Sequence, residues 1–179
     1  MSKSFRLRTI TANDELRYMD YIQKWGEESS IIPYTARLRG RTFEAFLSDL
    51  ELSRKGLLDP WNLVPDETFI MVDDTETIYG VLNLRFYLSD ILFRFYGHIG
   101  YGILPDFQNK GYGTFMLQLG LTEASKRGLD SVLITTSIEN IGSQKVIEKC
   151  GGVFENTVEN EEELINRYWV KTSGSLLSK

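Results

Sequence analysis

The chain has 179 residues, of which 42% are hydrophobic and 25% are charged, and this is the composition of an ordinary globular protein. Its length favours a single domain, which we expect over residues 1–172, with a loose C-terminal tail at residues 173–179. One cysteine, Cys150, excludes an internal disulfide framework. With His98 as the single histidine, too few ligands remain for a structural zinc site, and we expect no metal.

The formal net charge of −5 speaks against broad nucleic-acid binding and mildly favours a cationic partner. No stretch approaches the ~18–20 consecutive apolar residues of a membrane helix, and the N-terminal segment lacks the apolar run of a secretory signal. We therefore expect a cytoplasmic protein that acts on small molecules or peptides and has no membrane partner.

In chain order, the pattern predicts a first strand at residues 5–10 and then an amphipathic helix on which Leu16, Met19 and Ile22 form the apolar face. The further expected elements are a loop at 30–41, a helix at 43–56, a loop at 60–65, hairpin strands at 68–72 and 77–88, a strand at 94–104, a helix at 113–126, a strand at 131–136, a helix at 140–150, and hairpin strands at 153–158 and 164–171. This order indicates an α/β fold, a mixed sheet with helices on its faces.

The most informative segment, residues 105–114, lies between a strand ended by proline and the start of a helix. Gly111 and Gly113 allow the backbone to approach a ligand closely. The first N–H groups of the helix are unpaired at the positive end of the dipole, which suits a pyrophosphate, and Lys110 adds a positive charge. The spacing matches neither a P-loop nor G-x-G-x-x-G, and the glycines alone fit an ordinary strand-to-helix turn equally well.

The pattern Gln108-x-x-Gly111-x-Gly113 resembles the acetyl-CoA-binding motif of the GCN5-related N-acetyltransferases (GNAT). Asn140-x-x-Ser143, followed by residues 146–152, resembles the next conserved block of that family. Residues 83–85 and 97–101 resemble a bacterial subgroup of predicted acetyltransferases. The resemblance covers roughly residues 77–152, together with residues 167–169.

The resemblance implies a splayed, mixed sheet of six or seven strands, flanked by helices on both faces. It implies an enzyme that transfers the acetyl group of acetyl-CoA directly to a primary amine of a small molecule or peptide, in a ternary complex, with a homodimer as the default assembly. Backbone groups around Ile103 would hold the pantetheine arm, and Asn140 would contact it. The amides of the turn would hold the pyrophosphate; its residues are Gln108, Asn109, Lys110, Gly111, Tyr112, Gly113 and Thr114.

Two residues are candidates for proton transfer. His98 is a candidate general base, and the alternative is a half-buried strand histidine. Where many relatives carry a tyrosine that protonates the thiolate, this chain has Ile147, and where some carry a glutamate it has Thr135. Ser143 could take the tyrosine's role, or Ser143 and Asn140 could simply cap a helix.

The expected strand at 94–104 places His98, Gly100 and Gly102 on one face, which is bare enough for the close approach of another backbone or a ligand. Asn83 and Arg85 share a face of their own strand. They could reach the acceptor amine or orient His98, or they could be solvated edge residues.

Four aromatic residues in the first third of the chain would line the acceptor cleft or pack in the core: Tyr21, Trp25, Tyr34 and Trp61. Residues 159–163 are expected to form a solvated hairpin tip, and Cys150 a structural thiol. Because Ile147 and Thr135 occupy habitual catalytic positions, a non-catalytic module that senses acyl-CoA remains an alternative. A nucleotide-binding domain is a more remote one.

Overall fold

The computed structural model describes residues 4–58 and 64–172. The expected loop at 60–65, Trp61 and the expected tail at 173–179 therefore lie wholly or mainly outside the described residues. The described strands are β1 (Phe5–Thr9), β2 (Asp66–Asp73), β3 (Ile78–Arg85), β4 (Ile99–Ile103), β5 (Ser131–Ser137), β6 (Val153–Glu159) and β7 (Leu164–Lys171). The α-helices are α1 (Glu15–Gln23), α2 (Phe43–Arg54), α3 (Tyr112–Lys126) and α4 (Ile141–Lys149).

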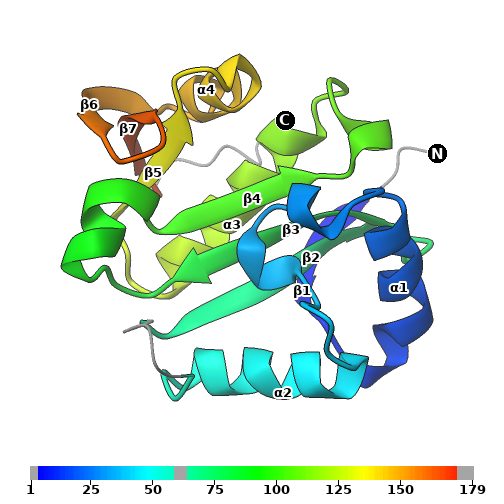
Figure 1. Ribbon diagram of the computed structural model, residues 1–179. Coiled ribbons are helices and arrows are strands. Elements are labelled where there is room, and N and C mark those ends of the chain that lie inside the picture. The colour runs from blue at the N-terminus through cyan, green and yellow to red at the C-terminus, as the bar shows by residue number, and fades with distance from the viewer. Residues whose placement is uncertain (1–3, 59–63, 173–179) are drawn as a thin grey trace.

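The seven strands form two sheets, with the order β1-β2-β3-β4 in one and β5-β7-β6 in the other (Figure 1). The α/β class and the splayed sheet are confirmed. Every strand pairing within the two sheets is antiparallel, so neither sheet mixes parallel and antiparallel pairs. The sheets approach each other where the backbone N–H of His98 donates to the carbonyl of Leu133 at 2.7 Å. Beyond that point β4 and β5 share no ladder, and the gap between them shapes the site described below.

Helices cover both faces of the larger sheet (Figure 1). On one face, α1 and α2 enclose an apolar cluster that includes Tyr18, Phe46 and Val81. On the other face, α3 packs Met116 and Leu117 into a second cluster that continues through both sheets. This second cluster fixes the position of α3, and therefore of its N-terminus, relative to β4.

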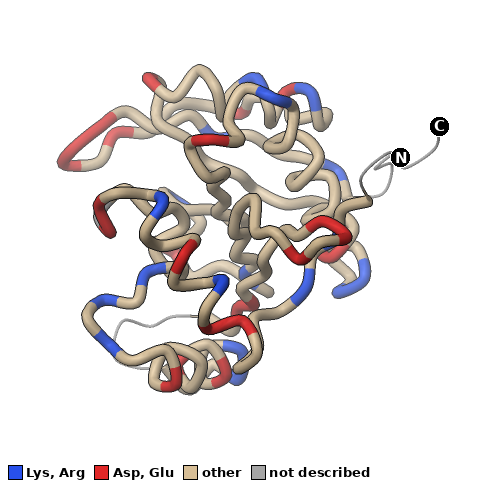
Figure 2. Tube along the Cα trace, turned by 90° about the vertical axis from the view of Figure 1, so that its right-hand side faces the viewer, with Lys and Arg blue, Asp and Glu red and all other residues tan. Residues whose placement is uncertain are grey.

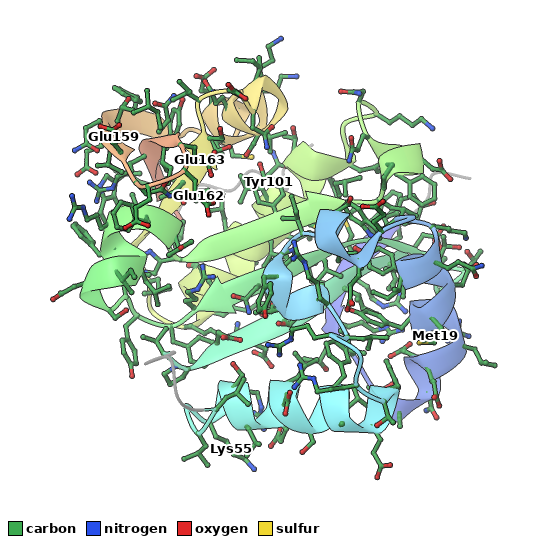
Figure 3. All side chains as sticks on the ribbon, viewed as in Figure 1. Met19, Lys55, Tyr101, Glu159, Glu162 and Glu163 are labelled. Carbon is green, nitrogen blue, oxygen red and sulfur yellow. The ribbon has the colours of Figure 1, made fainter. Side chains whose placement is uncertain are left out.

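The buried face of α1 differs from the predicted one. Leu16 is 87% exposed and Met19 45% exposed, and Met19 lies on the outer side of α1 in Figure 3. The buried residues are Tyr18 and Tyr21. Tyr18 stacks on Phe46 with a centroid distance of 5.2 Å, and its hydroxyl donates to a backbone carbonyl at 2.7 Å. The prediction was wrong because tyrosine rings supply the apolar surface here, and the hydroxyl of Tyr18 finds a partner inside the core.

The expected strand at 94–104 is shorter than predicted. Residues Leu92–Tyr96 form a single π-helical turn, and the strand begins at Ile99. The turn is held by the second sheet, because the hydroxyl of Thr135 donates to the carbonyl of Phe95 at 2.9 Å. Arg167 of β7 donates to a further carbonyl of the same turn at 3.2 Å. These partners come from residues distant in sequence, so the local pattern could not reveal them.

Candidate active site

A cleft of about 780 Å³ opens between β4 on one side and β5 with α4 on the other. It has two ends. One end is formed by α4 and the turn before α3, which follows β4, and the other by the π-helical turn that precedes β4 and by the β6–β7 hairpin. Ile32, in the loop after α1, packs over Gly102 of β4 between the two ends. Tyr101, Asn140 and Ser143 line the middle.

The first end presents backbone N–H groups at the start of a helix. Gly111 precedes α3 with φ 87°, in the left-handed region that glycine adopts without strain. No side chain caps α3, so the N–H groups of its first turn remain available at the positive end of the helix dipole. Of the predicted turn residues, Gln108, Asn109, Gly111, Gly113 and Thr114 line the cleft. This geometry suits a pyrophosphate.

Two of the predicted turn residues lie elsewhere. The ammonium group of Lys110 donates to the carbonyl of Asp106 at 2.8 Å, and Lys110 does not line the cleft. Tyr112 packs beneath the turn, with its ring 4.9 Å from that of Tyr79 and 5.4 Å from that of Phe5. The side chain of Tyr112 therefore supports the turn, and only its backbone can contribute to anion binding.

Cationic side chains come instead from α4, where Lys145 and Lys149 line the same end of the cleft. Their spacing of four residues places them on one face of a helix. That spacing is readable in the sequence, but it does not say which face meets the turn. Packing of α4 against α3 decides this, as in the approach of Val146 to Gly113, where a Cβ would lie 3.3 Å from the valine methyl.

Ile103 lies in the cleft wall, at the end of β4. Its carbonyl accepts a hydrogen bond from the side-chain amide of Gln108 at 2.9 Å, so it points away from β3. Gln108 thus ties the turn to the open edge of β4. The backbone of β4 beside the cleft has pairing groups that are free of β3, and the family resemblance implies that the groups around Ile103 hold the pantetheine arm.

Asn140 caps α4, because its side-chain oxygen accepts from the N–H of Ser143 at 2.9 Å. The hydroxyl of Ser143 in turn lies 3.2 Å from the hydroxyl of Tyr101 across the cleft. Burial raises the pKa of Tyr101 to about 12. No pattern in the sequence marks Tyr101 as a site residue, because its partner Ser143 lies 42 residues later in the chain.

His98 lies at the point where the two sheets meet, outside the residues that line the cleft. It is 8% exposed, and its Nδ1 accepts from the N–H of Leu133 at 2.9 Å. The neutral ring therefore carries its proton on Nε2. Burial lowers the pKa of His98 to about 4, and the charge of Arg85 adds to this effect. The geometry favours the structural alternative for His98.

Asn83 and Arg85 do share a face of β3, but neither lines the cleft. Asn83 is fully buried, and its amide donates to Asp66 at 2.8 Å and to Thr68 at 3.1 Å. Arg85 donates to the carbonyl of Gly97 at 2.9 Å. Both residues thus brace β3 and the segment before β4, and the structure does not bring them to the predicted acceptor position.

Cys150 sits at the end of α4, with its sulfur 3.6 Å from the carbonyl of Thr114. Burial raises the pKa of its thiol to about 11. A thiol that stays protonated near neutral pH is a poor nucleophile. This agrees with the structural role expected for Cys150.

The second end of the cleft carries aromatic and acidic side chains. Phe95 and Tyr96 line it, together with Glu162 and Glu163 from the β6–β7 hairpin, and Trp25 lines the cleft from the loop after α1. In Figure 3 these two glutamates lie in the upper part of the view, on the same side of the molecule as Tyr101. The hairpin tip is therefore part of the cleft wall, although its sequence predicts only a solvated turn. Of the other predicted aromatics, Tyr21 is buried in the core and Tyr34 is 57% exposed.

The glycines of β4 accommodate the loop after α1. A Cβ on Gly102 would overlap with the carbonyl oxygen of Ile32, whereas a Cβ on Gly100 would lie 3.4 Å from Pro33. The bare face therefore receives a backbone segment, which was one of the two predicted occupants. Ile32 itself lines the cleft, so Gly102 indirectly sets the position of the cleft wall.

We expect Gly102→Ala to destabilise the fold by about 1–3 kcal/mol and to raise the KM for the amine, because the added methyl displaces the Ile32 backbone. Gly100→Ala is the matched control, since its methyl has room. Chemical denaturation and steady-state kinetics with varied amine measure the two effects. Equal behaviour of the two variants would show that the loop does not depend on this contact.

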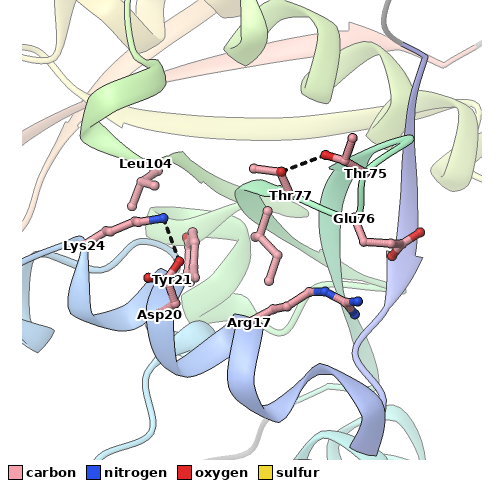
Figure 4. Close-up of a pocket in the computed structure, with 9 residues that line it drawn as sticks. Arg17, Asp20, Tyr21, Lys24, Thr75, Glu76, Thr77 and Leu104 are labelled. Atoms are coloured by element: carbon pink, nitrogen blue, oxygen red, sulfur yellow. Dashed lines mark hydrogen bonds and ion pairs between the residues drawn. The ribbon is translucent and has the colours of Figure 1, made fainter.

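A smaller cavity of about 210 Å³ lies between α1 and the β2–β3 turn (Figure 4). Its polar groups largely bind one another. Lys24 pairs with Asp20 at 2.6 Å, and the hydroxyls of Thr75 and Thr77 lie 2.9 Å apart. The cavity is thus bounded by local pairs, and Tyr21 is the one candidate aromatic among the described residues that line it.

Lys and Arg are interspersed with Asp and Glu along the described chain, as Figure 2 shows. Within residues 4–58 and 64–172, no group of three or more His, Cys, Asp or Glu side chains is placed to hold a metal ion. Over the same residues, no helix combines the length and apolarity needed to cross a membrane.

Known proteins were compared with the chain. Residues 5–153 match the model of the acetyltransferase (GNAT) domain. No curated protein matches the sequence. Among solved structures, a variant of spermidine N-acetyltransferase from Vibrio cholerae has 19% identity and a TM-score of 0.64, covering 97% of this chain and 96% of that one.

An acetyltransferase from Salmonella typhimurium, which modifies the N-terminal serine of a 50S ribosomal subunit protein, has 17% identity and a TM-score of 0.68. The match covers 95% of this chain and 96% of that one. At these identities the structures share the fold. The family model spans most of the sequence, from β1 to the start of β6, and includes the turn before α3. The chain belongs to the GNAT family of acetyltransferases.

Proposed function

We propose that this protein transfers the acetyl group of acetyl-CoA directly to a primary amine, with both substrates bound in the cleft at once. The observation that carries the proposal is the continuity of the cleft, which joins an anion-binding end to an acidic and aromatic end. The family uses acetyl-CoA as the acetyl donor. Holding two reactants in one cleft is itself a large part of catalysis.

The residues at the first end fit coenzyme A. The N–H groups at the start of α3 and the ammonium groups of Lys145 and Lys149 would hold its phosphates. The open backbone edge of β4 and the side chain of Asn140 would hold the pantetheine arm. When bound, acetyl-CoA supplies an acetyl group activated as a thioester. A backbone N–H of β4 would polarise the thioester carbonyl.

The amine must be neutral when it attacks. At pH 7 deprotonation costs about 4.6 kcal/mol for a lysine-like amine and about 1.4 kcal/mol for an α-amine. His98 was the predicted base, yet its available lone pair is already bonded to Leu133. We therefore propose that the amine loses its proton to solvent in the cleft. Ser143, the residue that the sequence offered for the departing thiolate, lines the middle of the cleft.

We further propose a cationic acceptor, because Glu162 and Glu163 line its end of the cleft. The two enzymes of known structure act on spermidine and on a protein N-terminus, and both of these substrates are amines. A small polyamine and a basic peptide share this chemistry. The predicted homodimer and the cytoplasmic location stay predictions.

We expect the double variant Glu162→Gln, Glu163→Gln to raise the KM for a diamine roughly 3- to 10-fold at low salt, with a smaller effect on a monoamine. Glu159→Gln is the matched control, because Glu159 belongs to the same hairpin but does not line the cleft. Kinetics at two salt concentrations measure the effect. An unchanged KM for every amine would exclude these glutamates from acceptor binding.

The central test is release of free thiol from acetyl-CoA with a panel of amines that includes polyamines, peptide N-termini and lysine side chains. Thiol release that depends on the amine, with matching acetylated product, would support the enzyme. Tight binding of acetyl-CoA with no turnover over the whole panel would instead support the acyl-CoA-sensing alternative. Competition by ATP or NAD would point to a nucleotide domain.

A further inference from the structure

We propose that Tyr101 is the proton donor to the thiolate of coenzyme A and that Ser143 orients its hydroxyl. This inference rests on the proposed function. Tyr101 lines the middle of the cleft, between the anion-binding end and the acidic end. The pantetheine arm of coenzyme A, if it runs from the phosphates along β4 toward the acceptor, must pass Tyr101.

The hydroxyl of Tyr101 is fixed in place. It lies 3.2 Å from the hydroxyl of Ser143, which stands on the first turn of α4 and whose N–H is held by Asn140. The phenol is thus anchored from across the cleft by a capped helix. This contact gives Ser143 a positioning role. Ser143 then need not donate a proton itself, which suits an alkyl hydroxyl because it is a much weaker acid than a phenol.

The proton balance is complete without another reactant. The amine nitrogen forms a bond to the carbonyl carbon, the carbon–sulfur bond breaks, and the electron pair stays on sulfur. The Tyr101 hydroxyl gives its proton to that sulfur, and the phenolate regains a proton from the solvent that accepted the one lost by nitrogen. The net products are the amide and the free thiol.

The surroundings of Tyr101 keep it in the donor form. Burial raises its pKa, Cys150 at the end of α4 adds to the rise, and the hydrogen bond with Ser143 opposes it. Lys145 and Lys149 on α4 are the cationic groups of the neighbouring cleft wall. Tyr87 is 57% exposed and does not line the cleft, so it provides a matched tyrosine control.

We expect Tyr101→Phe to lower kcat about 100-fold or more, with little change in the KM for acetyl-CoA, in line with the usual contribution of general acid catalysis. Tyr87→Phe should retain wild-type kcat. Ser143→Ala should lower kcat less than Tyr101→Phe, and the double variant should be no worse than Tyr101→Phe alone. Thermal unfolding verifies that each variant folds.

Two measurements separate proton donation from packing. Replacing Tyr101 by difluorotyrosine, whose phenol is more acidic, should move the alkaline limb of the kcat profile to lower pH. In calorimetry, wild type should bind coenzyme A more tightly than its desulfo analogue, and Tyr101→Phe should lose this preference. The inference would be overturned if Tyr101→Phe kept wild-type kcat, or if difluorotyrosine left the alkaline limb of the kcat profile unchanged. If wild type itself releases no thiol with any amine, the proposed function fails first.

Discussion

Gly111→Asp is expected to weaken coenzyme A binding about 100-fold or more. The carboxylate would stand at the N-terminus of α3, where the phosphates are proposed to bind, and two like charges about 5 Å apart repel by roughly 3 kcal/mol at an effective dielectric constant of 20. A Cβ at Gly111 meets no atom within 4 Å, so bulk contributes little. Calorimetry with coenzyme A measures the loss.

The matched control is Gly111→Asn, which has nearly the same shape and tolerates the left-handed conformation, φ 87°, better than most residues. It should retain most of the affinity, so the difference between Asp and Asn isolates the charge. Gly113→Asp should also abolish binding, but there the Cβ approaches Val146 and packing contributes. Equal affinity in wild type and Gly111→Asp would show that this turn does not hold the phosphates.

The geometry of the turn before α3 was predictable because its determinants are local. Glycine at a left-handed position and a helix without a side-chain cap are both properties of consecutive residues. The lengths and order of most elements follow from similar local patterns. Even here, the side chains of Lys110 and Tyr112 could not be placed, because their partners, Asp106 and Tyr79, are set by the packing of the turn.

The middle and the acceptor end of the cleft depend on contacts between residues far apart in the chain. The pair Tyr101–Ser143 joins a strand to a helix 42 residues later. The hairpin glutamates line the cleft because β7 pairs with β5 and carries the hairpin there. A single sequence offers no signal for either contact. Hydrophobic period and motif spacing describe one element at a time.

The second large effect concerns stability, and we expect the free energy of unfolding to fall as the pH drops from about 6.5 to about 4. His98 has a folded-state pKa of about 4, below its ordinary value of 6.5. In this interval the unfolded chain binds a proton that the folded chain excludes, so acid favours unfolding. The contribution of His98 is fully present above pH 6.5 and is lost by about pH 4, and it amounts to about 3 kcal/mol.

His98→Asn tests this expectation, because an asparagine oxygen can still accept from the N–H of Leu133 but does not titrate in this range. Urea unfolding at several pH values should show a shallower pH dependence for His98→Asn than for wild type. His98→Ala, by contrast, should be less stable than wild type by about 1–3 kcal/mol near neutral pH, because it leaves a buried N–H without a partner. Parallel curves for wild type and His98→Asn would contradict a depressed pKa.

The same variants decide whether His98 acts in catalysis. If His98 is structural and joins the segment before β4 to β5, its replacement changes the geometry of the cleft and lowers kcat for all amines by the same factor. A general base matters most for amines of high pKa, because these cost the most to deprotonate. We therefore expect the ratio of kcat for a lysine-like amine to kcat for an α-amine to be the same in wild type and His98→Asn. A selective loss on the lysine-like amine would restore His98 as the base, and the proton would then have to enter at Nδ1 in place of the Leu133 hydrogen bond.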